Sequence, residues 1–531
     1  MKRWFVYFAV GVTAVLLLLS SVLATAQVAV TTYHNDNYRS GANTNETILT
    51  PSNVNEVQFG KLHTLSVTGY VYGQPLYVPS VNINGVLHNV VYAVTEHDQA
   101  YAFDANTGRQ LWEKNFLIST NPAKTILPIS GRDNNCYVTG NEIGITSSPV
   151  IDITSNEIYL VAATKEIVNN VTTFYNRMHV LDIRTGVEKL SGPYFGAAIT
   201  AKVPGTGSGS VDGYITFDPR MQIQRAALTF SNGLVFVAWA GYCDFPPFHG
   251  YVMAFNKNTL QPSGVFVTTP NGFDGGIWNS GSGAAVDSSN NIYLPTGNGF
   301  FDAYLGGSDY GDSILRLLWA GGHPVVTDYF TPWNQAWLNL VDHDVASGGV
   351  LLLPDQPGAP YPHLLVQCGK EGTIDLVNRD NMGHFHAGGD TQIVQTLPYI
   401  ITEFWGSPAM WNNNLYFGGQ NAPLEAFYYN PETQQIQVQF TSQTAEDFTY
   451  PGPTPSVSAN GVNDGIVWIF GSDSIVRAYD ANNLATELYN SNQNPGRDKA
   501  GTVVQFVVPT VADGMVFVGA KNEVDVYGLL K

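Results

Sequence analysis

Two short segments and one turn carry side chains suited to metal binding or proton transfer. Asp342-His343-Asp344 is a consecutive run that suits a metal or acid–base pair, although in a loop the same residues also serve turn hydrogen bonds. Cys243, Asp244 and His249 have the donor atoms of a transition-metal site, but the Pro-Pro between them is equally typical of packing residues. Lys370 lies in a Gly-x-x-Gly turn, where its charge either meets a ligand or is simply solvated.

The cysteines limit the redox chemistry. There are only three, Cys136, Cys243 and Cys368, so at most one disulfide forms and one thiol is left over. A Cys136 to Cys243 pair is compatible with the sequence. No Cys-x-x-Cys-His motif is present, and we therefore expect no covalently attached c-type haem.

Composition indicates a compact, turn-rich protein. The 531 residues are 44% hydrophobic and 13% charged, with 53 Gly and 29 Pro. This is the profile of a folded β-rich chain, since disordered chains carry far more charge. The formal net charge of -19 argues against binding to nucleic acid or to an anionic membrane surface, because both require clustered Lys and Arg.

The first 26 residues resemble a signal peptide. Lys2 and Arg3 precede an apolar stretch from Trp4 to Leu19, and Ala24-Thr25-Ala26 forms a small-residue cleavage site. An uncleaved anchor is the alternative, but the stretch is short and contains Gly11. No later stretch is long and apolar enough to span a bilayer. We expect an exported protein, periplasmic or extracellular, that begins near Gln27.

A repeated strand–turn–strand pattern organises the rest of the chain. Its clearest copy runs from Val91 to Trp112 and ends in Asp-x-x-Thr-Gly-x-x-x-Trp. The copies are counted by small residues at the start of a strand: Gln74-Pro75, Ser148-Pro149, Ala226-Ala227, Gly283-Ala284, Gly348-Gly349, Ser407-Pro408, Thr454-Pro455 and Pro509-Thr510. Small residues suit strands that crowd around an axis. The pattern predicts an all-β, eight-bladed β-propeller of four-stranded antiparallel blades over 55–531, with seven blades as the alternative.

Two N-terminal segments precede the first repeat. Residues 27–54 are rich in Asn, Thr and Gly without periodicity, which predicts an extended arm along the surface. Phe59 to Val67 reads as an outer strand with no repeat before it. We expect this strand to close the ring by completing the last blade, because a closed ring leaves no unpaired sheet edge.

The repeat is similar to that of a known family. Tyr101 to Trp112 resembles the tryptophan-docking repeat of pyrroloquinoline quinone (PQQ)-type propellers, with weaker copies at 179–186 and 478–481. The resemblance covers the whole mature chain and implies that Trp112 packs between neighbouring blades. It indicates the fold more strongly than the function, because many such propellers bind no quinone.

Four stretches resemble site motifs of the quinoprotein alcohol dehydrogenases. By that resemblance, Trp278 in Gly275-Gly276-Ile277-Trp278 would be the aromatic floor beneath PQQ, and Asn298 in a Gly-Asn-Gly segment would be a calcium ligand. Asp342 would be the catalytic base, and Lys370 would be the cation that contacts the quinone. PQQ is planar and acidic, so an aromatic face, a cation and a hard metal suit it.

Two departures from the family pattern weaken this resemblance. The family's glutamate calcium ligand is replaced by Asp244, which aligns only with a shift of one residue. The family also caps PQQ with a disulfide between adjacent cysteines, whereas the comparable stretch here has Cys136 alone. The upper face of the quinone would then lack its usual cover.

Two functional hypotheses remain open. The departures favour an exported PQQ-like propeller that serves as a scaffold for a small-molecule ligand or a protein partner, with a degenerate central site. The alternative is a PQQ- and calcium-dependent dehydrogenase of an alcohol or sugar, in which calcium polarises the quinone and Asp342 accepts the alcohol proton. Convergence of Asp244, Asn298 and Asp342 around Trp278 distinguishes the two hypotheses.

Overall fold

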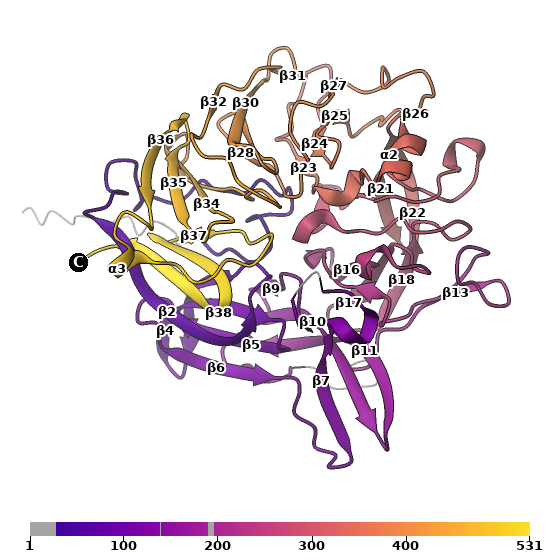
Figure 1. Cartoon of the computed structure of the whole chain (residues 1–531), viewed down its shortest axis with the longest axis horizontal. Coiled ribbons are helices and arrows are strands. Elements are labelled where there is room, and N and C mark those ends of the chain that lie inside the picture. The colour runs from indigo at the N-terminus through magenta and orange to yellow at the C-terminus, as the bar shows by residue number, and fades with distance from the viewer. Residues whose placement is uncertain (1–27, 138–139, 190–195) are drawn as a thin grey trace, which may run out of the picture.

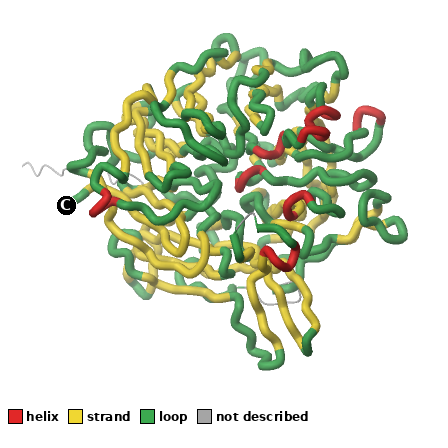
Figure 2. Tube along the Cα trace, in the orientation of Figure 1, coloured by secondary structure: helices red, strands yellow, loops and turns green. Residues whose placement is uncertain are grey.

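Short antiparallel sheets make up most of the molecule. The computed structural model describes residues 28–137, 140–189 and 196–531, so the expected signal peptide lies outside the described residues. Strands and long connecting loops dominate, and the few helices are short (Figures 1 and 2). In the described part of the chain, no helix is both long and apolar enough to cross a membrane.

Within the described residues, eight sheets of three to five strands follow one another, beside one two-stranded hairpin. The first sheet contains β3 (Leu76–Ile83), β4 (Val86–Thr95), β5 (Gln99–Asp104) and β6 (Gln110–Asn115), and the second contains β7 (Lys124–Ser130), β8 (Glu142–Ile143), β9 (Val150–Asp152), β10 (Glu157–Val168) and β11 (Val171–Asp182). The third sheet contains β14 (Gln222–Ile223), β15 (Thr229–Ser231), β16 (Leu234–Gly241), β17 (Tyr251–Asn256) and β18 (Pro262–Val267). The fourth sheet contains β19 (Ala285–Val286), β20 (Ile292–Pro295), β21 (Ile314–Ala320), β22 (His323–Thr331) and β26 (His384–Phe385).

The fifth sheet contains β23 (Leu351–Leu352), β24 (Leu364–Cys368), β25 (Ile374–Asn378) and β27 (Gln395–Leu397), and the sixth contains β28 (Ala409–Trp411), β29 (Asn414–Gly418), β30 (Leu424–Asn430), β31 (Gln435–Ile436) and β32 (Ser442–Gln443). The seventh sheet contains β33 (Ser456–Asn460), β34 (Asn463–Phe470), β35 (Val476–Asp480) and β36 (Asn483–Asn490), and β1 (Ala42–Asn43) joins it. The eighth sheet contains β37 (Thr510–Ala512), β38 (Met515–Leu529) and β2 (Phe59–Tyr70). The hairpin is β12 (Lys202–Pro204) with β13 (Tyr214–Thr216), and the α-helices are α1 (Gly131–Asn134), α2 (Gln335–Val341) and α3 (Pro495–Asp498).

Each small-residue start seen in the sequence lies at or just before a strand, which we call the first strand of that repeat. In the sheets of β9 and β15, other strands come before it along the chain. Gln74-Pro75 leads directly into β3, and Ser407-Pro408 leads directly into β28. Glycines at these starts pack against neighbouring chain segments: a Cβ on Gly348 would lie 2.1 Å from the carbonyl oxygen of Cys368. Crowding therefore explains the small residues. The strand number varies from sheet to sheet, which departs from a uniform four-stranded repeat.

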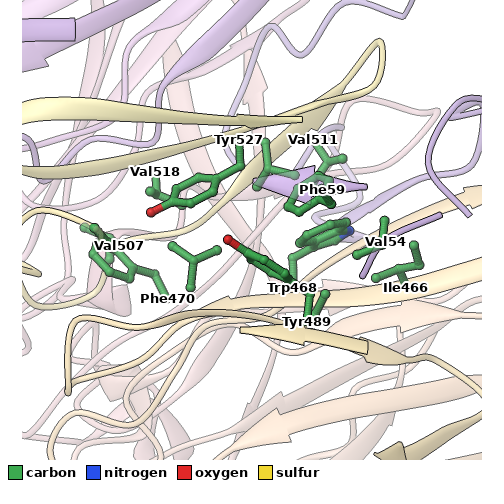
Figure 3. Close-up of a cluster of buried hydrophobic side chains, with 14 of the residues drawn as sticks. Val54, Phe59, Ile466, Trp468, Phe470, Tyr489, Val507, Val511, Val518 and Tyr527 are labelled. Atoms are coloured by element: carbon green, nitrogen blue, oxygen red, sulfur yellow. The ribbon is translucent and has the colours of Figure 1, made fainter. Parts of the chain in front are cut away.

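The two ends of the chain share a sheet. β2 pairs antiparallel with β38, from Phe59 opposite Leu529 to Tyr70 opposite Lys521, and the indigo and yellow strands lie together in Figure 1. Aromatic side chains bury the junction with the preceding sheet (Figure 3). The ring centroids of Phe59 and Trp468 are 5.4 Å apart. The expected pairing of an N-terminal strand with the last repeat is therefore present.

The arm before β2 makes hydrogen bonds with every sheet in turn. The bonds join, in chain order, Val30 to Tyr77 of β3, Thr31 to Ile151 of β9, Asn37 to Phe230 of β15 and Val286 of β19, Tyr38 to Leu352 of β23, Ser40 to Met410 of β28, Gly41 to Val457 of β33, and Asn43 to Val511 of β37. Each partner belongs to the first strand that follows a small-residue start. The arm is thus partly buried and bonded to all eight sheets, while residues such as Asp36 and Ile48 remain exposed.

Trp112 joins the first two sheets, as the repeat predicts. Its Nε1 donates to the carbonyl oxygen of Ile183 at 2.9 Å, and its ring packs in the cluster that contains Leu160 and Leu181. A Cβ on Gly186, in the next copy of the Thr-Gly motif, would lie 2.6 Å from the Trp112 ring. The glycine of one repeat therefore makes room for the tryptophan of the repeat before it.

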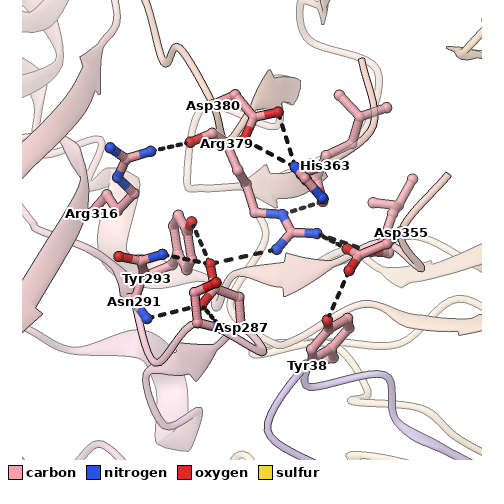
Figure 4. Close-up of polar contacts among 12 residues, drawn as sticks. Tyr38, Asp287, Asn291, Tyr293, Arg316, Asp355, His363, Arg379 and Asp380 are labelled. Carbon is pink, nitrogen blue, oxygen red and sulfur yellow. Dashed lines mark hydrogen bonds and ion pairs between the residues drawn. The ribbon is translucent and has the colours of Figure 1, made fainter. Parts of the chain in front are cut away.

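Arg379, which follows the Lys370 turn along the chain, has a structural role. Its guanidinium pairs with Asp355 at 2.6 Å and donates to the carbonyl oxygen of Leu364 (Figure 4). Tyr38 of the arm also bonds to Asp355. These contacts tie the arm to the strands beneath it.

Candidate functional site

A cavity of about 380 Å³ lies where the segments that precede the first strands meet. Tyr72 precedes β3, Arg225 precedes β15, Trp278 precedes β19, Trp405 precedes β28 and Tyr450 precedes β33, and all line the cavity. Contributions from so many sheets place this central cavity where the sheets converge. It is large enough for a small-molecule ligand.

The central cavity and the arm are separated along the first strands. In four sheets a cavity residue precedes an arm-bonded residue by five positions: Tyr72 and Tyr77, Ser347 and Leu352, Trp405 and Met410, Phe506 and Val511. Five extended residues span up to about 16 Å. The arm therefore lies at the far end of the first strands and leaves the cavity end free.

Lys370 holds two carboxylates at the cavity wall. Its side chain is only 8% exposed, and its Nζ lies 2.6 Å from Asp344 Oδ2 and 3.0 Å from Asp342 Oδ1. The ammonium also lies over the ring of Trp405, 4.7 Å from its centroid. Burial would lower the pKa of Lys370, but Asp344 and Asp342 outweigh burial and raise it, so the side chain stays charged.

The two aspartates of the acidic run differ in exposure. Asp344 is 6% exposed at its side chain, whereas Asp342 is 71% exposed. Asp342 Oδ1 accepts hydrogen bonds from Lys370 Nζ and from Asn298 Nδ2 at 2.8 Å, and these bonds hold the carboxylate in place. Asp344 instead accepts the Asn298 backbone N–H and lies beneath the surface.

Asn298 lies beside the cavity with one atom unmatched. Its backbone N–H and its side-chain Nδ2 both donate to aspartates, but its Oδ1 is buried without a hydrogen-bond partner. A buried amide oxygen is normally satisfied, so this atom suits a ligand or cation. The tight approach of this segment requires glycine next to it, since a Cβ on Gly297 would lie 2.4 Å from Asp344 Oδ1.

Asp244 lines the same cavity. Its carboxyl group is open to the cavity but surrounded by protein, and burial with the nearby charge of Asp344 raises its pKa to about 7, against a smaller opposing effect of Lys370. The structure therefore brings Asp244, Trp278, Asp342 and Lys370 to one cavity, with Asn298 hydrogen-bonded to its wall.

A disulfide lies at the cavity in place of a pair of adjacent cysteines. Cys136 and Cys243 are joined with an S–S distance of 2.06 Å, and Cys243 lines the cavity with Trp278. Both Cys243 and Trp278 pack against the same buried cluster. Cys136 therefore pairs with a cysteine distant in sequence, and the bond lies at the cavity wall.

Reduction of this disulfide is expected to destabilise the protein and loosen the cavity wall. The two cysteines are 107 positions apart, and a loop of that size contributes about 4 to 5 kcal/mol in the chain-entropy description. We expect a lower thermal midpoint in the presence of a phosphine reductant, measured by tryptophan fluorescence. The Cys136→Ser/Cys243→Ser variant should unfold at the reduced protein's midpoint and should not respond to reductant. An unchanged midpoint in the wild type would contradict the prediction.

Sequence reasoning missed the second cation of the cavity. Arg225 is 5% exposed, lines the cavity, and lies 4.4 Å from the ring centroid of Phe506. Its Nη2 has no hydrogen-bond partner, and within the described residues it forms no ion pair with a carboxylate. Trp405, also missed, has a buried Nε1 without an acceptor. The sequence did contain one signal for Arg225: a large, charged residue lies directly before the small-residue start Ala226-Ala227.

Comparison with known proteins supports the fold. No protein-family model matches the chain, and no curated protein matches its sequence. Among solved structures, the quinohemoprotein alcohol dehydrogenase ADHIIG from Pseudomonas putida HK5 is similar with a TM-score of 0.60 and 14% identity, over 94% of this chain and 80% of that chain. The quinohemoprotein alcohol dehydrogenase from Comamonas testosteroni gives 0.60 and 13%, over 95% and 81%.

A third similar structure is a europium-containing methanol dehydrogenase. Its TM-score is 0.58 at 12% identity, over 94% of this chain and 98% of that chain. Identities this low establish architecture and leave activity open. The chain therefore has a β-propeller fold like that of the quinoprotein alcohol and methanol dehydrogenases.

Proposed function

We propose that this protein is an exported, eight-bladed propeller whose ring is closed by β2, and that its central cavity binds a planar, anionic ligand of the PQQ class. The observation that carries the proposal is the set of unsatisfied donors at the cavity wall. Arg225 Nη2 and Trp405 Nε1 are buried without acceptors, and the Lys370 ammonium, already paired with Asp342 and Asp344, lies over the Trp405 ring. A ligand with carboxylate and quinone oxygens would satisfy the two unpartnered donors and would also meet the positive charge of Lys370.

The aromatic lining supports a planar ligand. Trp278 and Trp405 line the cavity, with Tyr72 and Phe506 against Arg225. Flat rings and a polarisable disulfide favour stacking, and the cations supply orientation. The cavity volume of about 380 Å³ suits one such molecule.

A second candidate function is oxidation of an alcohol or sugar. The observation that favours it is the unpartnered Oδ1 of Asn298, because an amide oxygen and the Asp244 carboxylate are the hard donors that calcium prefers. Asn298 and Asp244 would hold the ion, which would supply Lewis-acid polarisation to a bound quinone. No group of three acidic, His or Cys side chains suited to a metal exists among the described residues, so the ligand would complete the coordination.

Asp342 is the residue proposed as proton acceptor in that reaction. Lys370 and Asn298 both bond to its Oδ1, which orients the carboxylate, and the side chain is 71% exposed. Asp344 is committed to Lys370 and to the Asn298 backbone. We therefore assign proton transfer to Asp342 and positioning of Lys370 to Asp344.

Titration of the oxidised, full-length mature protein with PQQ tests the binding proposal. We expect quenching of tryptophan fluorescence and a saturable calorimetric signal. The affinity for PQQ should fall at least tenfold in Arg225→Gln. It should be unchanged in the control Arg184→Gln, because the Arg184 side chain is 44% exposed. Absence of saturable PQQ binding would overturn the proposal. Dye-linked oxidation of primary alcohols and sugars with PQQ and calcium then tests the second function. Binding of PQQ without turnover would exclude the dehydrogenase function and leave the binding proposal intact.

A further inference from the structure

A second cavity lies on the other side of the wall that contains Asp344. It has a volume of about 290 Å³ and is lined by Asp344, Gly369 and Glu371, so the Lys370 turn separates it from the central cavity. The remaining wall comes from α2 and its preceding loop, from β25 and from the segment around Tyr399. None of the residues assigned to ligand contact above is used in this second cavity.

Three carboxylates of this second cavity have no cationic partner. Glu371, Asp375 and Asp390 all line it, and in the part of the chain that the structure describes none of them forms an ion pair with Lys, Arg or His. Their hydrogen bonds come from neutral donors. Asn334 Nδ2 donates to Glu371 at 2.6 Å, and the backbone N–H of Trp333 donates to Asp390 at 2.8 Å.

The pKa values of Asp375 and Asp390 are both raised in this cavity. Burial and the neighbouring charges of Asp390 and Glu371 raise the pKa of Asp375 well above its usual range. Burial, with a smaller contribution from Glu371, raises the pKa of Asp390 to about 6, although His386 and local hydrogen bonds oppose the rise. Burial is the larger cause in both groups, and a positive charge between them would offset the repulsion that adds to it.

One carboxylate oxygen is left without any partner. Asp375 is only 4% exposed, and its Oδ1 is buried without a hydrogen bond, at the wall of the cavity. Buried carboxylate oxygens are normally satisfied, because an unmatched one retains its full desolvation cost. This oxygen lacks a donor, and its residue lines the cavity.

Aromatic rings surround the mouth of the same cavity. Trp333 is 53% exposed and Tyr399 is 67% exposed, and both also border an adjoining hollow with Trp337. Exposed aromatic faces attract cations and the alkyl groups that accompany them. Tyr399 lies close enough to Glu371 for the carboxylate to raise the pKa of its phenol.

We propose that this second cavity is a binding site for a primary organic ammonium ion. The ammonium would donate to Asp375 Oδ1 and lie among Glu371 and Asp390, and its hydrocarbon part would rest on Trp333 and Tyr399. A metal ion fits less well, since no three acidic, His or Cys side chains of the described residues converge as ligands. A quaternary ammonium could not donate to the unpartnered oxygen.

Calorimetric titration of the full-length mature protein with benzylammonium chloride tests this site. We expect saturable binding, with benzyl alcohol and tetramethylammonium each at least tenfold weaker, because one lacks the charge and the other lacks a donor. Asp375→Asn should weaken benzylammonium at least tenfold. Trp333→Ala should weaken it several-fold. The matched control Asp464→Asn, at an exposed position, should bind as the wild type does.

The variants also separate a folding defect from a loss of contact. Asp375→Asn removes a carboxylate from a repulsive cluster, so its thermal midpoint should equal or exceed that of the wild type. Unaltered benzylammonium affinity in Asp375→Asn would overturn the proposal. The proposal would also be overturned if benzyl alcohol bound as tightly as benzylammonium, or if benzylammonium binding did not saturate. Displacement of benzylammonium by a lower concentration of calcium would overturn it as well. Because Arg225 lines only the central cavity, Arg225→Gln should leave benzylammonium binding intact whatever becomes of PQQ.

Discussion

Replacing Arg39 by methionine is expected to lower the free energy of unfolding by about 3 to 5 kcal/mol, because it removes a cation that ties the N-terminal arm to two sheets. Arg39 is fully buried. Its guanidinium donates to Thr229 Oγ1 of β15 and to the carbonyl oxygen of Ala284, next to β19, at 2.8 Å. It also donates to the arm's own Tyr33 carbonyl oxygen at 2.8 Å.

The large effect follows from what the substitution leaves behind. Each acceptor that loses its donor remains buried, and an unmatched buried polar group costs about 1 to 3 kcal/mol. Methionine fills most of the volume, so the loss reports on hydrogen bonding more than on a cavity. The arm bonds to every sheet in turn, and we therefore expect its release to reduce the cooperativity of unfolding as well.

Urea unfolding followed by tryptophan fluorescence checks this expectation. The matched control is Arg109→Met, at an exposed position in the first repeat, which should change the free energy of unfolding by less than about 0.5 kcal/mol. If Arg39→Met and Arg109→Met unfold at the same urea concentration, the arm does not stabilise the ring in the way that its contacts imply.

The sequence predicts the repeats because their signals are local. Small residues before a strand, a turn and a second apolar strand recur along the chain, and Trp112 packs where its motif places it. The course of the arm is not local. It is bound largely by backbone hydrogen bonds, such as Gly41 to Val457, which any sequence makes, so composition predicts only that the segment is extended.

The candidate site was predictable only in part. The residues that match short motifs, Asp244, Trp278, Asp342 and Lys370, do line one cavity. The Cys136 to Cys243 disulfide and the approach of Arg225 to the same space depend on contacts between sheets, which no motif encodes. The relative burial of Asp342 and Asp344 was equally hidden, because two residues in one loop differ only by the direction in which the backbone turns.

Replacing Lys370 by methionine is expected to reduce affinity for PQQ at least 100-fold and to lower the free energy of unfolding by about 3 to 5 kcal/mol. The ammonium is 8% exposed and pairs with Asp344, which is 6% exposed. Its loss leaves the Asp344 carboxylate buried without a cation. It also removes one of the positive charges that face the ligand. Lys370→Arg should retain part of the affinity, whereas Lys499→Met, at an exposed position, should change neither property.

The double variant Lys370→Met/Asp344→Asn separates the two roles of the lysine. Removing both partners of a buried ion pair costs far less than removing one, so the double variant should recover most of the stability lost in Lys370→Met. It should not recover PQQ binding, because the cation that meets the ligand is still absent. Recovery of both stability and affinity would mean that Lys370 acts only by neutralising Asp344, and the anionic-ligand site would then rest on Arg225 and Trp405 alone.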